Sequence, residues 1–386
     1  MANDTLLAVP FFTFMGLILE RSGMAEDLLD TVGQVFGPIR GGLALAVIFV
    51  GALLAATTGV VAASVISMGL ISLPIMLRYG YDRSLSSGVI AASGTLAQII
   101  PPSLVLILMA DQLGRSVGEM YKGAFIPGFM LMGLYVVWVV ILAVLKPHTV
   151  PALPPELGLL SRLAERVTFV LIPPLLLIFL VLGTIFLGIA TPTEGGAMGA
   201  MAALVIGFAR GRLNMKLLQQ ALASTTKLAS FVMFIMVGAT TFSMIFQAAD
   251  GPKWVEHLMA SLPGGQVGFL IVVNIMIFFL AFFLDYFELS FIVVPLLGPV
   301  AEKMGIDLIW FGVLLAMNMQ TSFMHPPFGF ALFFLRSVAP DKPYVDIYKG
   351  AIPFVLIQLV MVGALIAFPG IVTGSLDKKI EPDDGR

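Results

Sequence analysis

Ten long apolar runs follow one another along this chain, with little polar sequence between them. A helix needs roughly 20 apolar residues to cross the ~30 Å hydrocarbon core of a bilayer. Only 11% of the residues are charged and 59% are hydrophobic, whereas a soluble globular protein carries roughly 25% charged residues. The sequence therefore predicts an all-α polytopic membrane protein whose outer surface contacts the lipid bilayer. The runs are 5–20, 43–77, 84–110, 124–145, 168–189, 195–209, 228–247, 268–300, 308–335 and 350–370.

Two of the runs, 43–77 and 268–300, are too long for one crossing and are interrupted midway by polar residues. The interruptions are Thr57-Thr58-Gly59 in the first and Asp285 to Glu288 in the second. Non-helical backbone at membrane depth is tolerated where protein or a wet cavity satisfies it. We therefore predict two re-entrant helical hairpins, each entering and leaving the membrane on one side.

Positive charge tests this arrangement, because cytoplasmic loops carry an excess of Lys and Arg. When each hairpin counts as no crossing, five segments lie inside and hold 14 of the 21 Lys and Arg residues. The inside segments are 21–42, 78–83, 146–167, 210–227 and 336–349; the outside segments are 111–123, 190–194, 248–267 and 302–307. Counting either hairpin as a full span would destroy this bias.

The sequence also repeats itself at an offset of 225. Asp82 falls on Asp307 and the pair Pro101-Pro102 on Pro326-Pro327. Further on, the string YKGA at 121–124 recurs at 348–351, where the offset has become 227. In the predicted topology the two halves cross the membrane in opposite senses. Such an inverted repeat is common in alternating-access transporters, whose substrate site lies near the midplane.

The repeat divides the chain into four parts. Residues 1–145 are the first repeat, 146–167 a cytoplasmic linker with an interfacial helix at 156–167, 168–373 the second repeat, and 374–386 a polar tail. The second repeat has two helices, at 168–189 and 195–209, ahead of its scaffold helix at 228–247. The first repeat begins directly at the equivalent helix, so we expect two helices to be missing from its N-terminus.

Each half contains one helix that proline breaks in mid-membrane. Proline lacks an N–H group and clashes with the preceding turn, so Pro101-Pro102 interrupts the run 84–110 and Pro326-Pro327 interrupts 308–335. Carbonyl groups freed at such breaks suit a hard cation, and the N-termini of half-helices attract anions.

The two broken segments carry a family resemblance. GTLAQIIPPS at 94–103 and NMQTSFMHPPFGFA at 318–331, together with TPTE at 191–194, resemble signatures of the large membrane subunit of tripartite ATP-independent periplasmic (TRAP) transporters. The resemblance covers essentially the whole chain. It implies an elevator-type, sodium-driven importer of an organic acid in the bacterial inner membrane, with a small membrane subunit and a periplasmic solute-binding protein as partners.

Oxygen-bearing residues gather at the hairpin tips and the helix breaks, where they can ligate sodium without holding it too tightly. Asp285 and Glu288 are the sharpest of these signals, because an ionisable group at membrane depth is functional by default. A Ser or Thr that only bonds its own helix carbonyl is the alternative reading. The sodium candidates are Thr57, Thr58, Gly59, Ser93, Gly94, Thr95, Asp285, Glu288, Asn318, Gln320 and Thr321.

The half-helices that follow the breaks are candidates for binding the substrate. Ser103 and Gly329 open these half-helices, so their backbone N–H groups can receive a carboxylate. Together with the prolines of the breaks, the substrate candidates are Pro102, Ser103, Pro327 and Gly329. The three histidines are too scattered in the sequence for a metal site, and no cysteine is present. We expect no cofactor, no metal beyond sodium, no enzymatic activity and no nucleic-acid partner. A stand-alone sodium-coupled carboxylate carrier and an ion channel remain alternatives.

Overall fold

The computed structural model describes residues 4–58, 61–152, 167–260, 263–325, 329–339 and 344–376, and every regular element in these ranges is helical. The prediction of an all-α fold is confirmed. The first half contains α1 (Asp4–Arg21), α2 (Met24–Phe36), α3 (Gly42–Thr58), α4 (Val61–Arg78), α5 (Arg83–Thr95), the 3-10 turn η1 (Leu96–Gln98), α6 (Leu104–Gln112), α7 (Val117–Leu145) and the turn η2 (Pro147–Thr149).

The second half is longer. It contains the π-helical turn η3 (Val167–Leu171), α9 (Ile172–Phe186), α10 (Pro192–Ala209), α11 (Met215–Ala248), α12 (Gly251–Ala260), α13 (Gly265–Leu280), α14 (Tyr286–Glu288), the π-helical turn η4 (Leu289–Val293), α15 (Val294–Lys303), α16 (Leu308–Met319), the 3-10 turn η5 (Gln320–Phe323), α17 (Phe330–Val338), α18 (Tyr344–Ala367) and α19 (Gly370–Thr373).

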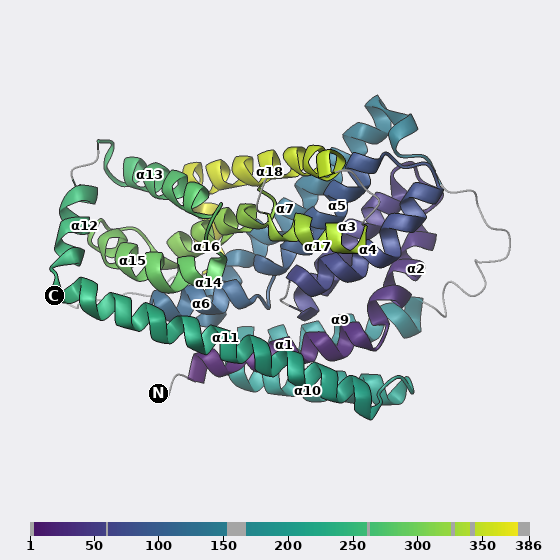
Figure 1. Ribbon diagram of the computed structural model, residues 1–386, viewed down its shortest axis with the longest axis horizontal. Coiled ribbons are helices and arrows are strands. Elements are labelled where there is room, and N and C mark those ends of the chain that lie inside the picture. The colour runs from purple at the N-terminus through teal and green to yellow at the C-terminus, as the bar shows by residue number, and fades with distance from the viewer. Residues whose placement is uncertain are drawn as a thin grey trace, which may run out of the picture.

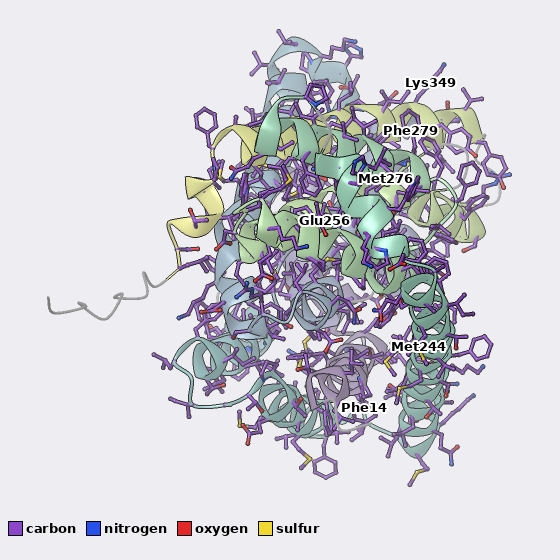
Figure 2. All side chains as sticks on the ribbon, turned by 90° about the vertical axis from the view of Figure 1, so that its left-hand side faces the viewer. Phe14, Met244, Glu256, Met276, Phe279 and Lys349 are labelled. Carbon is purple, nitrogen blue, oxygen red and sulfur yellow. The ribbon has the colours of Figure 1, made fainter. Side chains whose placement is uncertain are left out.

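The helices α1, α10 and α11 run side by side along one long edge of the molecule, and α13 and α18 lie along the opposite edge (Figure 1). Viewed along the long axis, Met244 of α11 lies low in the molecule and Met276 of α13 lies high (Figure 2). The buried face of α1 repeats with helical spacing at Ala8, Phe12 and Met15, each at most 1% exposed. This apolar face packs α1 against its neighbours, chiefly α10, α11 and α3.

Four helices among the described residues are long and apolar enough to cross a membrane, namely 117–145, 168–186, 215–248 and 344–367. A fifth span is possible if α1 and α2, bent by 62° at residues 22–23, are taken together. The remaining apolar helices are shorter, because the chain turns or breaks within each of the runs 43–77, 84–110, 268–300 and 308–335.

Segments assigned to the same side of the membrane are in contact. On the inside, Arg210 and Arg212 pair with Asp27 of α2 at 3.2 and 3.0 Å, and the Asp82 N–H donates to the Thr149 carbonyl at 3.0 Å. On the outside, Arg115 pairs with Glu302 at 2.7 Å and Lys303 with Glu256 at 2.6 Å. The contacts agree with the sides that the charge distribution assigns to these segments.

Two helices lie where the hydropathy pattern predicts loops. The amphipathic α2 occupies most of the inside segment 21–42, and α12 lies in the outside segment 248–267. Both carry charged residues on one face, so neither forms a continuous apolar run. The transmembrane helices α7 and α11 also start earlier than expected, at Val117 and Met215, with Ser116 and Asn214 capping their first turns. The predicted interfacial helix at 156–167 lies, except for its last residue, outside the described residues.

Local geometry recurs at the offset of 225. Gly80 and Gly305 both adopt positive φ, at 81° and 74°, before a capping aspartate. Asp82 accepts from the Leu85 N–H at 2.9 Å and Asp307 from the Trp310 N–H at 2.7 Å. In both halves the capped helix then ends in a 3-10 turn, which is followed by a second short helix.

The two halves interlock through glycine. A Cβ atom on Gly88 of α5 would lie 2.0 Å from the Gly350 carbonyl oxygen of α18. The equivalent residues, Gly123 and Val313, also meet: a Cβ atom on Gly123 would lie 3.6 Å from Val313 Cγ2. Helix α5 therefore packs against α18 of the other half, with backbones in direct contact.

Gly88→Ala is expected to lower the free energy of unfolding by ~1–3 kcal/mol, because the new methyl group must push α5 and α18 apart. Thermal unfolding in detergent measures this loss. Gly363→Ala is the control, since a Cβ atom on Gly363 of the partner helix α18 meets nothing within 4 Å. Equal melting temperatures for both variants would contradict the packing described here.

Candidate functional site

The first helix break presents two buried hydroxyl groups. Ser93 and Thr95 stand in the last turn of α5 and are both 0% exposed. The Ser93 hydroxyl donates to the Val89 carbonyl at 2.6 Å, and the Thr95 hydroxyl donates to the Ala92 carbonyl at 2.8 Å. Each donor thus bonds its own helix, as the alternative reading of these residues predicts. The hydroxyl oxygens keep acceptor lone pairs.

The first predicted hairpin packs directly on this break. A Cβ atom on Gly94 would lie 2.3 Å from Val65 Cγ2 of α4, and one on Gly51 of α3 would lie 2.5 Å from Ser93 Cβ. Glycine at both positions lets α3 and α4 approach the end of α5. Thr57 and Thr58 form the last turn of α3, but their side chains, and Gly59 entirely, lie outside the described residues.

At the second break the side chain of Asn318, on α16, forms hydrogen bonds with the neighbouring helix α13. Its Nδ2 donates to the backbone carbonyl of Asn274 on α13 at 2.7 Å and to the Asn274 side-chain oxygen at 3.1 Å. The Thr321 hydroxyl donates to the Asn318 carbonyl at 2.7 Å. Asn318 and Thr321 are 1% and 0% exposed.

The two breaks meet in the interior of the protein. Gln320 Nε2 donates to the Thr95 hydroxyl oxygen at 3.2 Å. The two residues are 225 apart in the sequence, which is the offset of the repeat. Positions equivalent in the repeat therefore touch each other, as they do when an axis relating two halves passes between them.

Sequence reasoning missed two polar residues that complete this cluster. Gln358 of α18 is 0% exposed, and its Nε2 donates to the Tyr135 hydroxyl at 2.9 Å and to the Thr95 hydroxyl at 3.4 Å. Asn274 of α13, the partner of Asn318, is 6% exposed. Both stand in the middle of apolar runs. This position could have identified them from the sequence, because polar groups at membrane depth are usually functional.

Several polar side-chain atoms, in this cluster and in the adjoining first break, are buried and have no hydrogen-bond partner among the described residues. They are Asn318 Oδ1, Gln320 Oε1, Gln358 Oε1 and both amide atoms of Gln98. An unpartnered buried polar atom costs about 1–3 kcal/mol, so several of them in one place need an explanation. Amide oxygens are suitable ligands for a hard cation. The described residues hold no group of three or more His, Cys, Asp or Glu that could bind a metal ion.

Asp285 and Glu288 lie at the turn between α13 and α15. Asp285 accepts from the Tyr286 N–H at 2.7 Å and caps the one-turn helix α14. Both carboxylates are half-buried, and Glu288 Oε2 has no hydrogen-bond partner within the described ranges. The contact between this turn and the second break is aromatic, with the rings of Tyr286 and Phe323 5.9 Å apart.

The predicted substrate residues start the second half-helices. The Ser103 hydroxyl accepts from the Leu106 N–H at 3.4 Å, which caps α6, and donates to the Gln98 carbonyl at 2.5 Å. Pro102, next to it, is buried. Gly329 precedes α17, and Pro327 lies outside the described residues.

His325, which the sequence alone does not single out, is 2% exposed beside the second break. Its ring lies 4.2 Å from that of Phe278 and 4.5 Å from that of Phe282. Both of its nitrogens lack a hydrogen-bond partner in the part of the chain that the structure describes. The imidazole is thus a further polar group held in an aromatic environment near α17.

Comparison with known proteins identifies the family. The family described as "Tripartite ATP-independent periplasmic transporter, DctM component" matches residues 1–371. The chain belongs to this family. It is similar to the C4-dicarboxylate TRAP transporter large permease protein DctM of Pseudomonas aeruginosa, with 32% identity over 95% of this chain and 85% of that one. It is 30% identical to the ectoine TRAP transporter large permease protein TeaC of Halomonas elongata, again over 95% and 85% of the two chains.

The fold is also found among solved structures. The YdaH transporter of Alcanivorax borkumensis superimposes with a TM-score of 0.65 over 96% of this chain and 85% of that one, at 17% identity. The likeness shows the fold alone. The family match establishes this chain as the large permease subunit of a TRAP transporter, a multi-pass membrane protein.

In this TRAP permease, Tyr135→Phe is expected to lower the free energy of unfolding by ~1–3 kcal/mol. The change removes the acceptor of the 2.9 Å hydrogen bond from the buried Gln358 amide, and a buried donor left without a partner is costly. Thermal unfolding in detergent measures the effect. Tyr344→Phe is the control, because Tyr344 is 43% exposed; equal losses in both variants would contradict a role for the buried bond.

Proposed function

We propose that this TRAP permease imports a small organic acid together with sodium ions, and that a periplasmic solute-binding protein delivers the substrate. The observation that carries the proposal is the cluster at the meeting of the two helix breaks. There Thr95 and Gln320 touch at 3.2 Å, and the amide oxygens of Asn318, Gln320 and Gln358 are buried without partners among the described residues. These oxygens supply ligands for sodium, a hard cation.

The remaining sodium candidates come from the same two breaks and from the tips of the predicted hairpins. The hydroxyls of Ser93 and Thr321 lie in the same two breaks, and Gly94 lets α4 approach the first of them. Glu288, whose Oε2 is buried, adds negative charge on the side of the second predicted hairpin. Thr57, Thr58 and Gly59, at the predicted tip of the first hairpin, are included on the sequence alone.

Transport in this proposal uses two inverted repeats, 1–145 and 168–373, that move as an elevator. The recurrence of capped helix, 3-10 turn and second helix at an offset of 225 supports the repeat. The contacts among inside segments and among outside segments support re-entrant hairpins at α3–α4 and α13–α15. The layer of α1, α10 and α11 is the scaffold against which the rest of the molecule slides (Figure 1).

The substrate class follows from the half-helix N-termini and from the relatives. Ser103 before α6 and Gly329 before α17 stand at helix N-termini, whose backbone N–H groups attract a carboxylate. Relatives carry names that specify C4-dicarboxylates, ectoine and sialic acid. We place the transporter in the bacterial inner membrane with a small membrane subunit as its partner.

Uptake by proteoliposomes tests the proposal. The vesicles hold this permease and its small subunit, with the solute-binding protein outside, and either a sodium or a proton gradient is imposed. C4-dicarboxylate uptake that requires both the sodium gradient and the binding protein is expected. Uptake without the binding protein would favour a stand-alone carrier, and unitary currents in electrical recordings would favour a channel.

Asn318→Ala and Ser93→Ala are expected to raise the sodium concentration needed for half-maximal uptake about tenfold each. A lost contact to a charged group is worth on the order of 1.4 kcal/mol or more. The measurement is uptake against sodium concentration at a fixed amount of folded protein. Ser337→Ala is the control, because Ser337 is exposed and its hydroxyl, within the described part of the chain, bonds the Phe334 carbonyl of its own helix. An unchanged sodium dependence in both site variants would remove these residues from the site.

A further inference from the structure

A cavity of about 540 Å³ lies between α3, α7 and α9. Its walls are almost entirely apolar and include Phe49 and Ala52 of α3, Phe129 of α7 and Phe179 of α9. Ile100 and Pro101 form part of its boundary. The cavity is open to the surface of the protein. Its volume falls in the usual range of ~300–1,000 Å³ for sites that bind a small molecule.

The chemistry of the walls selects an apolar occupant. Water needs two to four polar partners, and cavities lined by aliphatic and aromatic side chains stay dry. A small organic acid likewise needs several hydrogen-bond donors, which these walls do not offer. In a protein surrounded by a bilayer, an opening of this kind takes up a hydrocarbon chain.

One end of the cavity carries a positively charged side chain. Lys122 alone is charged among the described residues that line it, and Ser375 stands beside it, with its hydroxyl donating to the Lys122 carbonyl at 3.0 Å. Lys122 lies in the second turn of α7, whose 29 residues measure roughly 43 Å against a hydrocarbon core of ~30 Å. The first turns of α7 thus extend to the level of the lipid headgroups on the side assigned to the outside.

We infer that this cavity binds one membrane phospholipid with an anionic headgroup, whose acyl chain fills the space between α3, α7 and α9 while Lys122 contacts the phosphate. The acyl chain of the lipid lies against Pro101, the first proline of the broken helix. A bound lipid therefore touches both α9, which packs on the scaffold helix α10, and the break that carries Thr95. The inference stands independently of sodium coupling and of the substrate.

The protein offers a substitution that fills the cavity without disturbing its walls. Gly183 of α9 lines the cavity, and a Cβ atom there would meet nothing within 4 Å. Gly183→Phe is therefore expected to fold and to exclude the acyl chain. Gly133→Phe is the matched control, because Gly133 of α7 also has open space around its Cβ position but lies outside the cavity.

Native mass spectrometry of the full chain, stripped of lipid and titrated with dioleoyl phosphatidylglycerol, is the test. One lipid is expected to bind to the unaltered protein and to Gly133→Phe, with at least tenfold weaker binding to Gly183→Phe. Equal binding by all three proteins would overturn the assignment of the cavity.

The headgroup is tested by comparing dioleoyl phosphatidylglycerol with zwitterionic dioleoyl phosphatidylcholine. A lysine near the membrane surface is worth about 1 kcal/mol toward anionic lipid, so Lys122→Gln is expected to reduce the preference about fivefold. Lys349→Gln, at the equivalent position of the second YKGA string, serves as control and keeps the preference. An unchanged preference in Lys122→Gln, or displacement of the lipid by equimolar oleate, would overturn binding of an anionic phospholipid.

Discussion

A helix that breaks inside an apolar interior must find partners for the polar groups that it exposes, and the rest of this structure is arranged around that requirement. Both breaks, after α5 and after α16, are placed against each other, and Gln320 bonds Thr95 across them at 3.2 Å. Amide side chains from outside the breaks, Asn274 and Gln358, complete the cluster. The polar groups thus satisfy one another in part, and the oxygens that remain are the ones available to a cation.

Close backbone packing makes this meeting possible. Gly88 and Gly350 bring α5 and α18 of different halves into contact, and Gly94 admits α4 to the end of α5. Helices in membranes associate through small residues that let backbones approach, because lipid provides no hydrophobic driving force between them. In the outer layer, glycines of α10 likewise admit α1 closely, whereas most of α11 is exposed at the edge of the molecule (Figure 1).

Much of the fold was accessible from the sequence because the bilayer imposes a length on every apolar run. The charge bias also assigned sides to the loops, and the contacts of Asp27 with Arg210 and of Arg115 with Glu302 agree with it. The hydropathy pattern missed α2 and α12, since amphipathic helices with charged faces form no continuous run. Of the candidate residues, those in the two breaks lie together, whereas the tips of the predicted hairpins lie partly outside the described residues.

The sequence by itself determined the class of the protein, the positions of both helix breaks and the residues that line them, because proline and polar residues in apolar runs act locally. Only the tertiary structure decided which polar groups meet. Gln358 and Tyr135 have no motif, and Asn274 lies 44 residues from its partner Asn318. Their roles depend on how α7, α13 and α18 pack against the breaks, and packing between distant segments leaves no mark in the periodicity of a single chain.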